Sequence, residues 1–270
     1  MDFICPKCRN PLEPRGSAYV CRESHSYDVA RAGYVNLLPP SGSSVHGDNK
    51  EMLLARREFL DTGHYLPLSS RLCDLAVRYI PENAAVIDLG CGEGYYTDRL
   101  ERALSARDGH SRISALDISK DAVRYSMGRN KNVSCAVASA YSVPAKDGAF
   151  FGALNAFSPL AKNEVYRILT TGGVFIMTFP AEEHLFELKS AIYDTPYKNE
   201  PSDTALDGFK LLHTERLTYK MTLSSPEQIR SLFMMTPYAY RTKKENRERV
   251  LSLSSLECTA DFYVCVYEKL

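Results

Sequence analysis

The stretch Ala85-Val-Ile-Asp-Leu-Gly-Cys-Gly-Glu-Gly-Tyr-Tyr-Thr97 decides the fold class of this 270-residue chain. Apolar residues lead into Asp88 at the end of a predicted strand, three glycines follow at alternate positions, and a helical run begins at Tyr95. A strand, a glycine turn and a helix expose bare backbone to a ligand, and the start of the helix offers free N–H groups to an anion. The stretch therefore predicts an α/β fold with a ligand site at this turn.

The spacing of the glycines separates two classes of ligand. A dinucleotide fingerprint reads G-x-G-x-x-G, whereas Gly90, Gly92 and Gly94 are spaced G-x-G-x-G and follow Asp88. The form D-x-G-x-G-x-G resembles motif I of the class I S-adenosylmethionine (SAM)-dependent methyltransferases, which have a Rossmann-like sheet. We therefore expect a domain of that kind, with a dinucleotide site or a glycine turn without any ligand as the alternatives.

Composition excludes several other classes of protein. Acidic and basic residues balance at 33 each, so the net charge gives no sign of a nucleic-acid partner, and any basic surface must be local. The sequence has no apolar run of about 18 residues, which predicts no membrane span. Residues 1–10 lack the apolar core of a signal peptide, so we expect a cytoplasmic protein whose eight cysteines are thiols or metal ligands.

The first forty residues carry a pattern typical of a metal site. Cys5, Cys8, Cys21 and His25 are spaced C-x2-C-x12-C-x3-H, which has the ligand types and spacing of a structural zinc site. Four such ligands without a carboxylate predict tetrahedral Zn²⁺ with no open position. A redox C-x-x-C pair is the rival interpretation, but it would leave Cys21 and His25 unused.

We predict three parts of the chain: a zinc-binding module at 1–38, a linker at 39–50 that is rich in Pro, Gly and Ser, and a methyltransferase domain at 51–270. The module is too short to fold without its metal. Its tyrosines and basic residues suit RNA bases and phosphates, although the tyrosines could simply pack a small core. These residues are Tyr19, Tyr27, Tyr34, Lys7, Arg9, Arg15, Arg22 and Arg31.

The next predicted strands supply candidate contacts to a nucleoside. Strand 112–117 ends in Asp117, where an acidic side chain accepts from the ribose hydroxyls of a bound nucleoside. Asp117 could instead cap the following helix, but Ser119 is available for that task. Strand 133–138 ends before Ser139, whose small side chain leaves room for an adenine ring and can hydrogen-bond it.

Candidate substrate contacts follow the fourth and fifth strands. The loop after the fourth strand, Asn155-Ala-Phe-Ser-Pro159, offers the amide of Asn155 to the edge of a base and an aromatic ring on which a base could stack. Glu182 and His184 follow strand 174–179 at the edge of the sheet where ligands bind, although His184 could equally be a surface or capping residue. Tyr65, just ahead of the glycine stretch, could stack on or hydrogen-bond to SAM, and packing is an equally good explanation for it.

Taken together, the motifs resemble one family, the bacterial 23S rRNA (guanine-N1-)-methyltransferases. The resemblance implies methyl transfer from SAM to a guanine N1 in a hairpin of 23S rRNA. It also implies zinc on Cys5, Cys8, Cys21 and His25, and some members of the family confer macrolide resistance. The motifs are the cysteine–histidine set, Gly-Tyr-Val-Asn-Leu-Leu at 33–38, Ala-Arg-Arg-x-Phe-Leu-Asp at 55–61, Gly-His-Tyr at 63–65, the glycine stretch at 88–97 and Met-Thr-Pro at 235–237.

The same resemblance implies that Tyr65, Gly92, Glu93, Asp117 and His184 contact SAM. The acceptor of the guanine proton stays open among Asn155, Glu182 and His184, and a homodimer is compatible with the sequence. Two other functions remain as alternatives: a methyltransferase of a small molecule or protein whose zinc module is purely structural, and an inactive zinc-containing RNA-binding protein.

Overall fold

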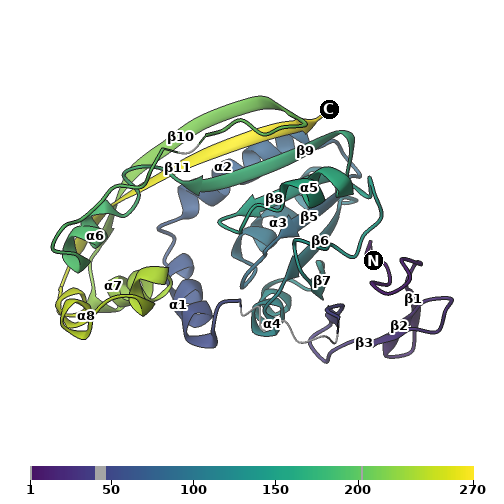
Figure 1. Cartoon of the computed structure of the whole chain (residues 1–270), viewed down its shortest axis with the longest axis horizontal. Helices are drawn as coiled ribbons and strands as arrows, with labels where there is room; N and C mark the ends of the chain where they lie inside the picture. Colours follow the sequence, from purple (N-terminus) through teal and green to yellow (C-terminus); the bar gives the residue numbers. More distant parts are fainter. Residues whose placement is uncertain (1, 40–46, 202) are drawn as a thin grey trace.

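The computed structural model describes residues 2–39, 47–201 and 203–270, and within them an eight-stranded sheet has the order β10-β11-β9-β8-β5-β6-β7-β4 (Figure 1). Its strands are β4 (Val35–Asn36), β5 (Ala85–Leu89), β6 (Arg112–Asp117), β7 (Ser134–Val137), β8 (Phe150–Ala156), β9 (Leu169–Pro180), β10 (Phe209–Leu223) and β11 (Leu256–Lys269). The helices are α1 (Lys50–Asp61), α2 (Leu66–Tyr79), α3 (Tyr95–Asp108), α4 (Lys120–Arg129), α5 (Lys162–Ile168), α6 (Phe186–Ile192), α7 (Pro226–Met234) and α8 (Lys244–Leu251), with a 3₁₀ turn, η1, at Pro237–Tyr240.

The direction of the strands indicates where a ligand would bind, which is at the end of β5. β5 pairs in parallel with β6 on one side and with β8 on the other, and the chain then proceeds outward in both directions. β11 is antiparallel to both of its neighbours, β9 and β10. In an open α/β sheet, ligands bind outside the carboxyl ends of the strands where the strand order changes direction. That position lies between the ends of β5 and β8, directly after Asp88.

Local sequence signals account for several element boundaries. β6 begins and ends at the predicted residues, and α3 is flanked by Gly94 and Gly109, both of which have left-handed backbone. Ser119 caps α4 by accepting from the N–H of Ala122, as predicted. β9 starts at Leu169 and not at residue 174, because Gly172 and Gly173 continue the strand.

The zinc-binding module covers part of one face of the sheet. Its small antiparallel sheet consists of β1 (Glu13–Arg15), β2 (Ala18–Val20) and β3 (Ser26–Asp28). Its exit segment, β4, joins the large sheet in parallel with β7. Cys5 and Cys21 are buried in the same apolar cluster as Ile87 and Leu116 of the central strands. The module is therefore packed into the domain, and of the predicted linker 39–50, residues 40–46 lie outside the described residues.

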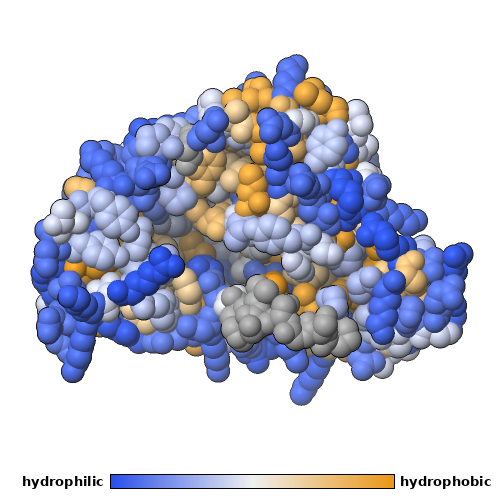
Figure 2. Space-filling model, viewed as in Figure 1, coloured by the Kyte–Doolittle hydropathy of each residue, from blue (hydrophilic) through white to orange (hydrophobic). Residues whose placement is uncertain are grey.

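The far end of the sheet carries a helical group. Figure 1 shows the long strands β10 and β11 running together to the end of the molecule where α6, α7 and α8 gather. Figure 2 shows the surface hollowed between that end and the part of the sheet that carries β8, with apolar side chains along one wall. None of the described helices has the length and apolar character needed to cross a membrane.

Candidate active site and metal centre

Glycine is required at the three positions of the turn for different structural reasons. All have positive φ, of 83°, 54° and 91° at Gly90, Gly92 and Gly94. A Cβ on Gly90 would lie 2.3 Å from Oγ of Ser158, and one on Gly94 would lie 2.7 Å from Cα of Ser126. A Cβ on Gly92 would meet only Arg56, at 3.9 Å. The outer two glycines therefore allow close packing, whereas the middle glycine has only the end of a flexible side chain near it, so its backbone can approach a ligand.

Asp88 is buried beneath this turn. One of its carboxylate oxygens, Oδ2, accepts a 2.5 Å hydrogen bond from the hydroxyl of Thr97. The other, Oδ1, is also buried and has no hydrogen-bond partner among the described residues. Burial raises the pKa of this carboxyl to about 7. A buried acceptor without a partner is costly, so this oxygen fits a ligand that carries donors or positive charge, as SAM does.

Asp117 lies beside the turn at the tip of β6. Its carboxylate accepts from the backbone N–H of Gly92 at 2.9 Å and of Ser119 at 2.8 Å. Burial raises the pKa of Asp117. Each oxygen keeps a second lone pair, so the half-buried carboxylate can still accept from ribose hydroxyls. Ser139 follows β7, the next strand, where its Oγ accepts from the N–H of Tyr141 at 3.2 Å.

The Glu93 carboxylate points into the protein. It is buried and forms a hydrogen-bonded ion pair with Arg129, which also pairs with Asp61 at 2.8 Å. These contacts tie the turn to the end of α4 and the end of α1. The side chain of Glu93 therefore fixes the turn in place, and its contact with the cofactor stays a prediction.

Tyr65 and His184 form a buried pair. The Tyr65 hydroxyl lies 3.3 Å from Nε2 of His184, and the backbone N–H of Asp261 donates to Nδ1 at 3.3 Å. Because Nδ1 is an acceptor, Nε2 carries the proton and donates it to Tyr65. Burial lowers the pKa of His184 to about 3, so the ring is neutral. Both nitrogens thus have partners inside the protein, so His184 positions Tyr65, and its contact with SAM stays a prediction.

The other two candidate proton acceptors are also engaged. Oδ1 of Asn155 accepts from the N–H of Ser158 at 3.2 Å, and its amide donates to the carbonyl of Pro159 at 3.4 Å. Oε1 of Glu182 accepts from the Tyr263 hydroxyl at 3.2 Å, and Oε2 pairs with Arg216 at 3.1 Å. Asn155 shapes the loop after β8, and Glu182 is held in an ion pair. The identity of the proton acceptor stays open.

Phe157 is the aromatic residue of the loop after β8, for which stacking on a base was predicted. It has a φ of 64°, a conformation that is costly for a residue with a side chain and that is concentrated at functional sites. The residue is 39% exposed, and the centroid of its ring lies 6.4 Å from that of Tyr65 and 6.0 Å from that of Tyr96. The neighbouring contact between Ser158 and Gly90 holds this loop against the glycine turn. An exposed aromatic ring is thereby fixed beside the glycine turn.

Arg56 brings three distant segments to the same turn. Its guanidinium lies over Gly92, forms an ion pair with Asp48, and donates to the carbonyl of Met235 at 3.4 Å. The turn, the segment before α1 and the Met-Thr-Pro motif therefore converge on one side chain. No local pattern could have indicated this, because 179 residues separate Arg56 from Met235.

The structure brings the four predicted metal ligands together. The ligand atoms of Cys5, Cys8, Cys21 and His25 all lie within 4.8 Å of one another. Nδ1 of His25 lies 3.5 Å from Sγ of Cys5 and 3.4 Å from Sγ of Cys21, and the sulfurs of Cys8 and Cys21 are 3.5 Å apart. A tetrahedral Zn²⁺ with Zn–S of roughly 2.3 Å spaces its ligand atoms by little more than this. The cluster therefore fits a closed, structural zinc site.

Two family descriptions match the chain. Residues 3–42 match the zinc ribbon described as RlmA, N-terminal, and residues 80–224, more than half of the chain, match a methyltransferase domain. The crystal structure of a protein from Bacillus halodurans C-125, named as a candidate methyltransferase, aligns with 74% of this chain and 98% of its own. The TM-score is 0.51 at 13% identity, so this similarity supports the fold alone. These matches confirm the predicted class I SAM-dependent methyltransferase domain and the zinc-binding module before it.

Three relatives carry the same assignment in their names. The 23S rRNA (guanine(748)-N(1))-methyltransferase of Streptomyces fradiae is 38% identical over 70% of this chain and 66% of its own length. A candidate 23S rRNA (guanine-N(1)-)-methyltransferase of Micromonospora griseorubida is 34% identical over 68% of this chain and 67% of its own length. One of Bacillus subtilis (strain 168) is 28% identical over 98% of this chain and 96% of its own length. The chain belongs to the 23S rRNA (guanine-N1-)-methyltransferase family.

Proposed function

We propose that this protein transfers the methyl group of SAM to N1 of a guanine in a hairpin loop of 23S rRNA. Family membership supports the substrate class. The observation that carries the chemistry is the open glycine turn, with Asp88 beneath it and Asp117 beside it at the ends of adjacent strands.

In this proposal the turn and its neighbours hold SAM. Asp117 accepts from the ribose hydroxyls, the backbone at Gly92 approaches the cofactor, and Ser139 lies next to the adenine. The unpaired oxygen of Asp88 faces the positively charged methionine end. Tyr65, held by His184, forms a further wall. SAM supplies an already activated methyl group, so the protein mainly orients the reacting partners.

The target guanine has to leave its stack to reach the methyl group, which favours a loop over an intact duplex. Phe157 presents an exposed ring in the loop after β8, where a base could stack on it. A bond forms between guanine N1 and the methyl carbon while the carbon–sulfur bond of SAM breaks. The proton on N1 leaves to an acceptor that is still to be identified.

The proposal also includes the setting of the reaction. The zinc-binding module, with its tyrosines and basic side chains, would hold the folded RNA. We place the reaction in the cytoplasm, where ribosomal RNA is available, and a homodimer and a link to macrolide resistance stay predictions.

Incubating the protein with labelled SAM and 23S rRNA tests this function. We expect label in RNA, as 1-methylguanine after digestion to nucleosides. Label in small metabolites or protein alone would favour the alternative of a small-molecule or protein methyltransferase whose zinc module is purely structural. RNA binding without any transfer would favour the inactive RNA-binding protein.

A further inference from the structure

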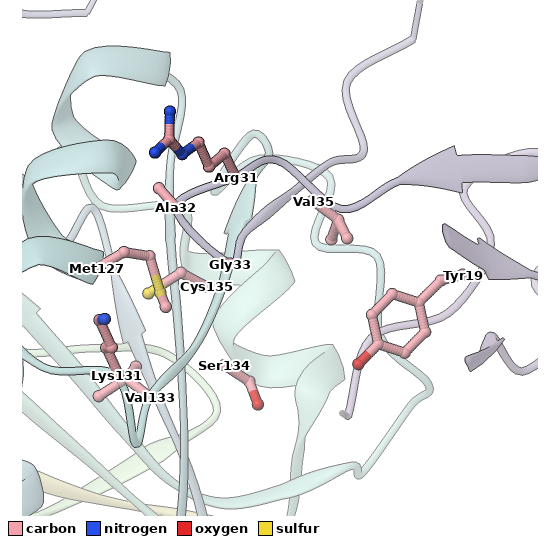
Figure 3. A pocket seen from close by; sticks show the side chains of 10 residues that line it. All are labelled: Tyr19, Arg31, Ala32, Gly33, Val35, Met127, Lys131, Val133, Ser134 and Cys135. Atoms are coloured by element: carbon pink, nitrogen blue, oxygen red, sulfur yellow. The ribbon is translucent and has the colours of Figure 1, made fainter. Parts of the chain in front are cut away.

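A pocket of about 380 Å³ lies where the zinc-binding module meets the edge of the large sheet (Figure 3). We call it the junction pocket. It is distinct from the glycine turn, because it is formed by the exit segment of the module, the end of α4 and the start of β7. Its volume is within the range of small-ligand sites. Its lining residues are Tyr19, Arg31, Ala32, Gly33, Val35, Met127, Lys131, Val133, Ser134 and Cys135.

The charge of the junction pocket suits an anion. Arg31 and Lys131 are the charged residues of its lining, which includes no carboxylate. Both are exposed, and neither has an ion pair or hydrogen bond to another side chain within the described part of the chain. Most other arginines of the protein are paired, so two unpaired cations at one rim are a specific feature. The hydroxyls of Tyr19 and Ser134 can add hydrogen bonds to a phosphate or a sugar.

The interior of the junction pocket suits a flat, apolar group. Figure 3 shows the ring of Tyr19 on one side and the side chain of Met127 on the other, with Cys135 between them. Met127 and Cys135 are buried and belong to the main apolar core. A nucleobase has an apolar face that stacks on an aromatic ring, and it carries its phosphate at a distance that a basic rim can reach. A free metal ion or a simple anion would leave this apolar interior unused.

One helix, α4, separates the junction pocket from the glycine turn. Met127 approaches Gly33 of the module so closely that a Cβ there would lie 3.0 Å from its Cε. The preceding residue, Ser126, packs against Gly94 of the turn. The end of α4 is therefore wedged between the two sites, which places them about one helix diameter apart, roughly 10 Å. A strand of RNA held in the junction pocket would be fixed close to the site of methyl transfer.

We propose that the junction pocket binds one unpaired nucleotide of the substrate RNA. Its phosphate lies between Arg31 and Lys131, and its base packs against Tyr19 and Met127. This nucleotide is not the methylated guanine, which enters at the glycine turn. The inference rests on the proposed function. It means that the junction between the zinc-binding module and the methyltransferase domain recognises an unpaired nucleotide of the RNA.

The test compares pocket variants in RNA binding and in catalysis. The double variant Arg31→Ala/Lys131→Ala should weaken binding of a 23S rRNA fragment about 10-fold or more and flatten the slope of log affinity against log salt by about 0.7, the value for one single-strand phosphate contact. The KM for RNA should rise while kcat at saturating RNA and the affinity for SAM stay unchanged. Tyr19→Leu should also raise this KM, and Tyr19→Phe should retain most of the affinity.

Lys210→Ala is the control, because Lys210 is an exposed basic residue of β10, at the opposite edge of the large sheet from the pocket. Its effect on RNA affinity and on the salt slope should be smaller than that of the double variant. A double variant with unchanged RNA affinity and slope, or an equal loss in Lys210→Ala, would overturn the inference. A fall in kcat at saturating RNA with no change in KM would overturn it too. If the unaltered protein itself transfers no methyl group to 23S rRNA, the proposed function fails first, and this is visible before any variant is compared.

Discussion

The hydroxyl of Tyr65 lies 3.3 Å from Nε2 of His184, although 119 residues separate the two in the sequence. The contact joins the turn before α2 to the loop after β9. The Tyr65 ring also packs edge-on against Phe59 and Phe262, with centroids 5.0 Å and 5.1 Å away. Both residues were predicted to contact SAM directly. That contact stays a prediction, and the geometry shows that His184 holds Tyr65 in a fixed position.

Tyr65→Phe tests that relationship. The substitution keeps the ring and removes the acceptor of the His184 N–H, which is then buried without a partner. We expect the free energy of unfolding to fall by roughly 1–3 kcal/mol, measured by urea denaturation. Tyr34→Phe is the control, because Tyr34 is also buried but no side-chain hydrogen bond involves its hydroxyl in the described chain. Equal losses in the two variants would contradict the pairing.

Asp117→Ala tests the ribose contact. The variant loses the carboxylate beside the glycine turn, so SAM should bind more weakly by roughly 1–3 kcal/mol in calorimetric titration. Asp121→Ala, which removes an exposed carboxylate paired with Arg124 on α4, should leave SAM affinity unchanged. If Asp117→Ala binds SAM as tightly as the unaltered protein does, the ribose assignment is wrong.

Cys8→Ser tests the metal centre and its place in the fold. The variant should lose bound zinc, measured by metal analysis. Because Cys5 and Cys21 are buried in one cluster with strands of the large sheet, the melting temperature of the whole protein should fall, not only that of the module. Cys73→Ser on α2 lies outside the cluster and should keep both zinc and melting temperature. Full metal content in Cys8→Ser would contradict the ligand set.

The carboxyl of Asp88 makes the stability of the cofactor-free protein depend on pH. Burial raises its pKa from 3.8 to about 7, so between these values the folded protein holds a proton that the unfolded chain has lost. The contribution of Asp88 is therefore present at low pH, and it is lost as pH rises toward about 7, at up to roughly 1.4 kcal/mol per pH unit.

Asp88→Asn should remove this contribution, and the difference between the two unfolding curves across that pH range isolates it from other titrating groups. His184 acts with the opposite sign, since its lowered pKa makes stability fall as pH decreases below about 6.5. Because a positively charged ligand favours the ionised carboxylate, SAM affinity should rise as pH rises through about 7. Identical pH dependence in Asp88→Asn would refute this account of Asp88.

Local signals in the sequence predicted much of the fold and part of the site. The glycine turn, the Ser119 cap and the four metal ligands follow from residue types at short spacings, and the structure brings each together as expected. Contacts between distant segments could not be predicted in this way. The ion pair of Glu93 with Arg129 is one example, and the joining of β4 to the edge of the large sheet is another.

The loop after β8 shows why such contacts matter for the site. Asn155 looked like a ligand for a base, because an amide at the end of a strand often faces a crevice. In the structure it holds its own loop, and the exposed group is Phe157, whose left-handed backbone depends on packing that a sequence pattern does not encode. Propensity alone would disfavour a phenylalanine in that conformation.

The central claim is methyl transfer from SAM to guanine N1 of 23S rRNA, and reverse transcription of rRNA treated with the protein and SAM tests it most directly. A methyl group on guanine N1 blocks Watson–Crick pairing and therefore stops the reverse transcriptase. We predict one new stop next to a guanine in a hairpin loop, which requires SAM and is weakened by Asp117→Ala at limiting SAM. An RNA without any new stop, under conditions where the protein demonstrably binds SAM, would contradict the account.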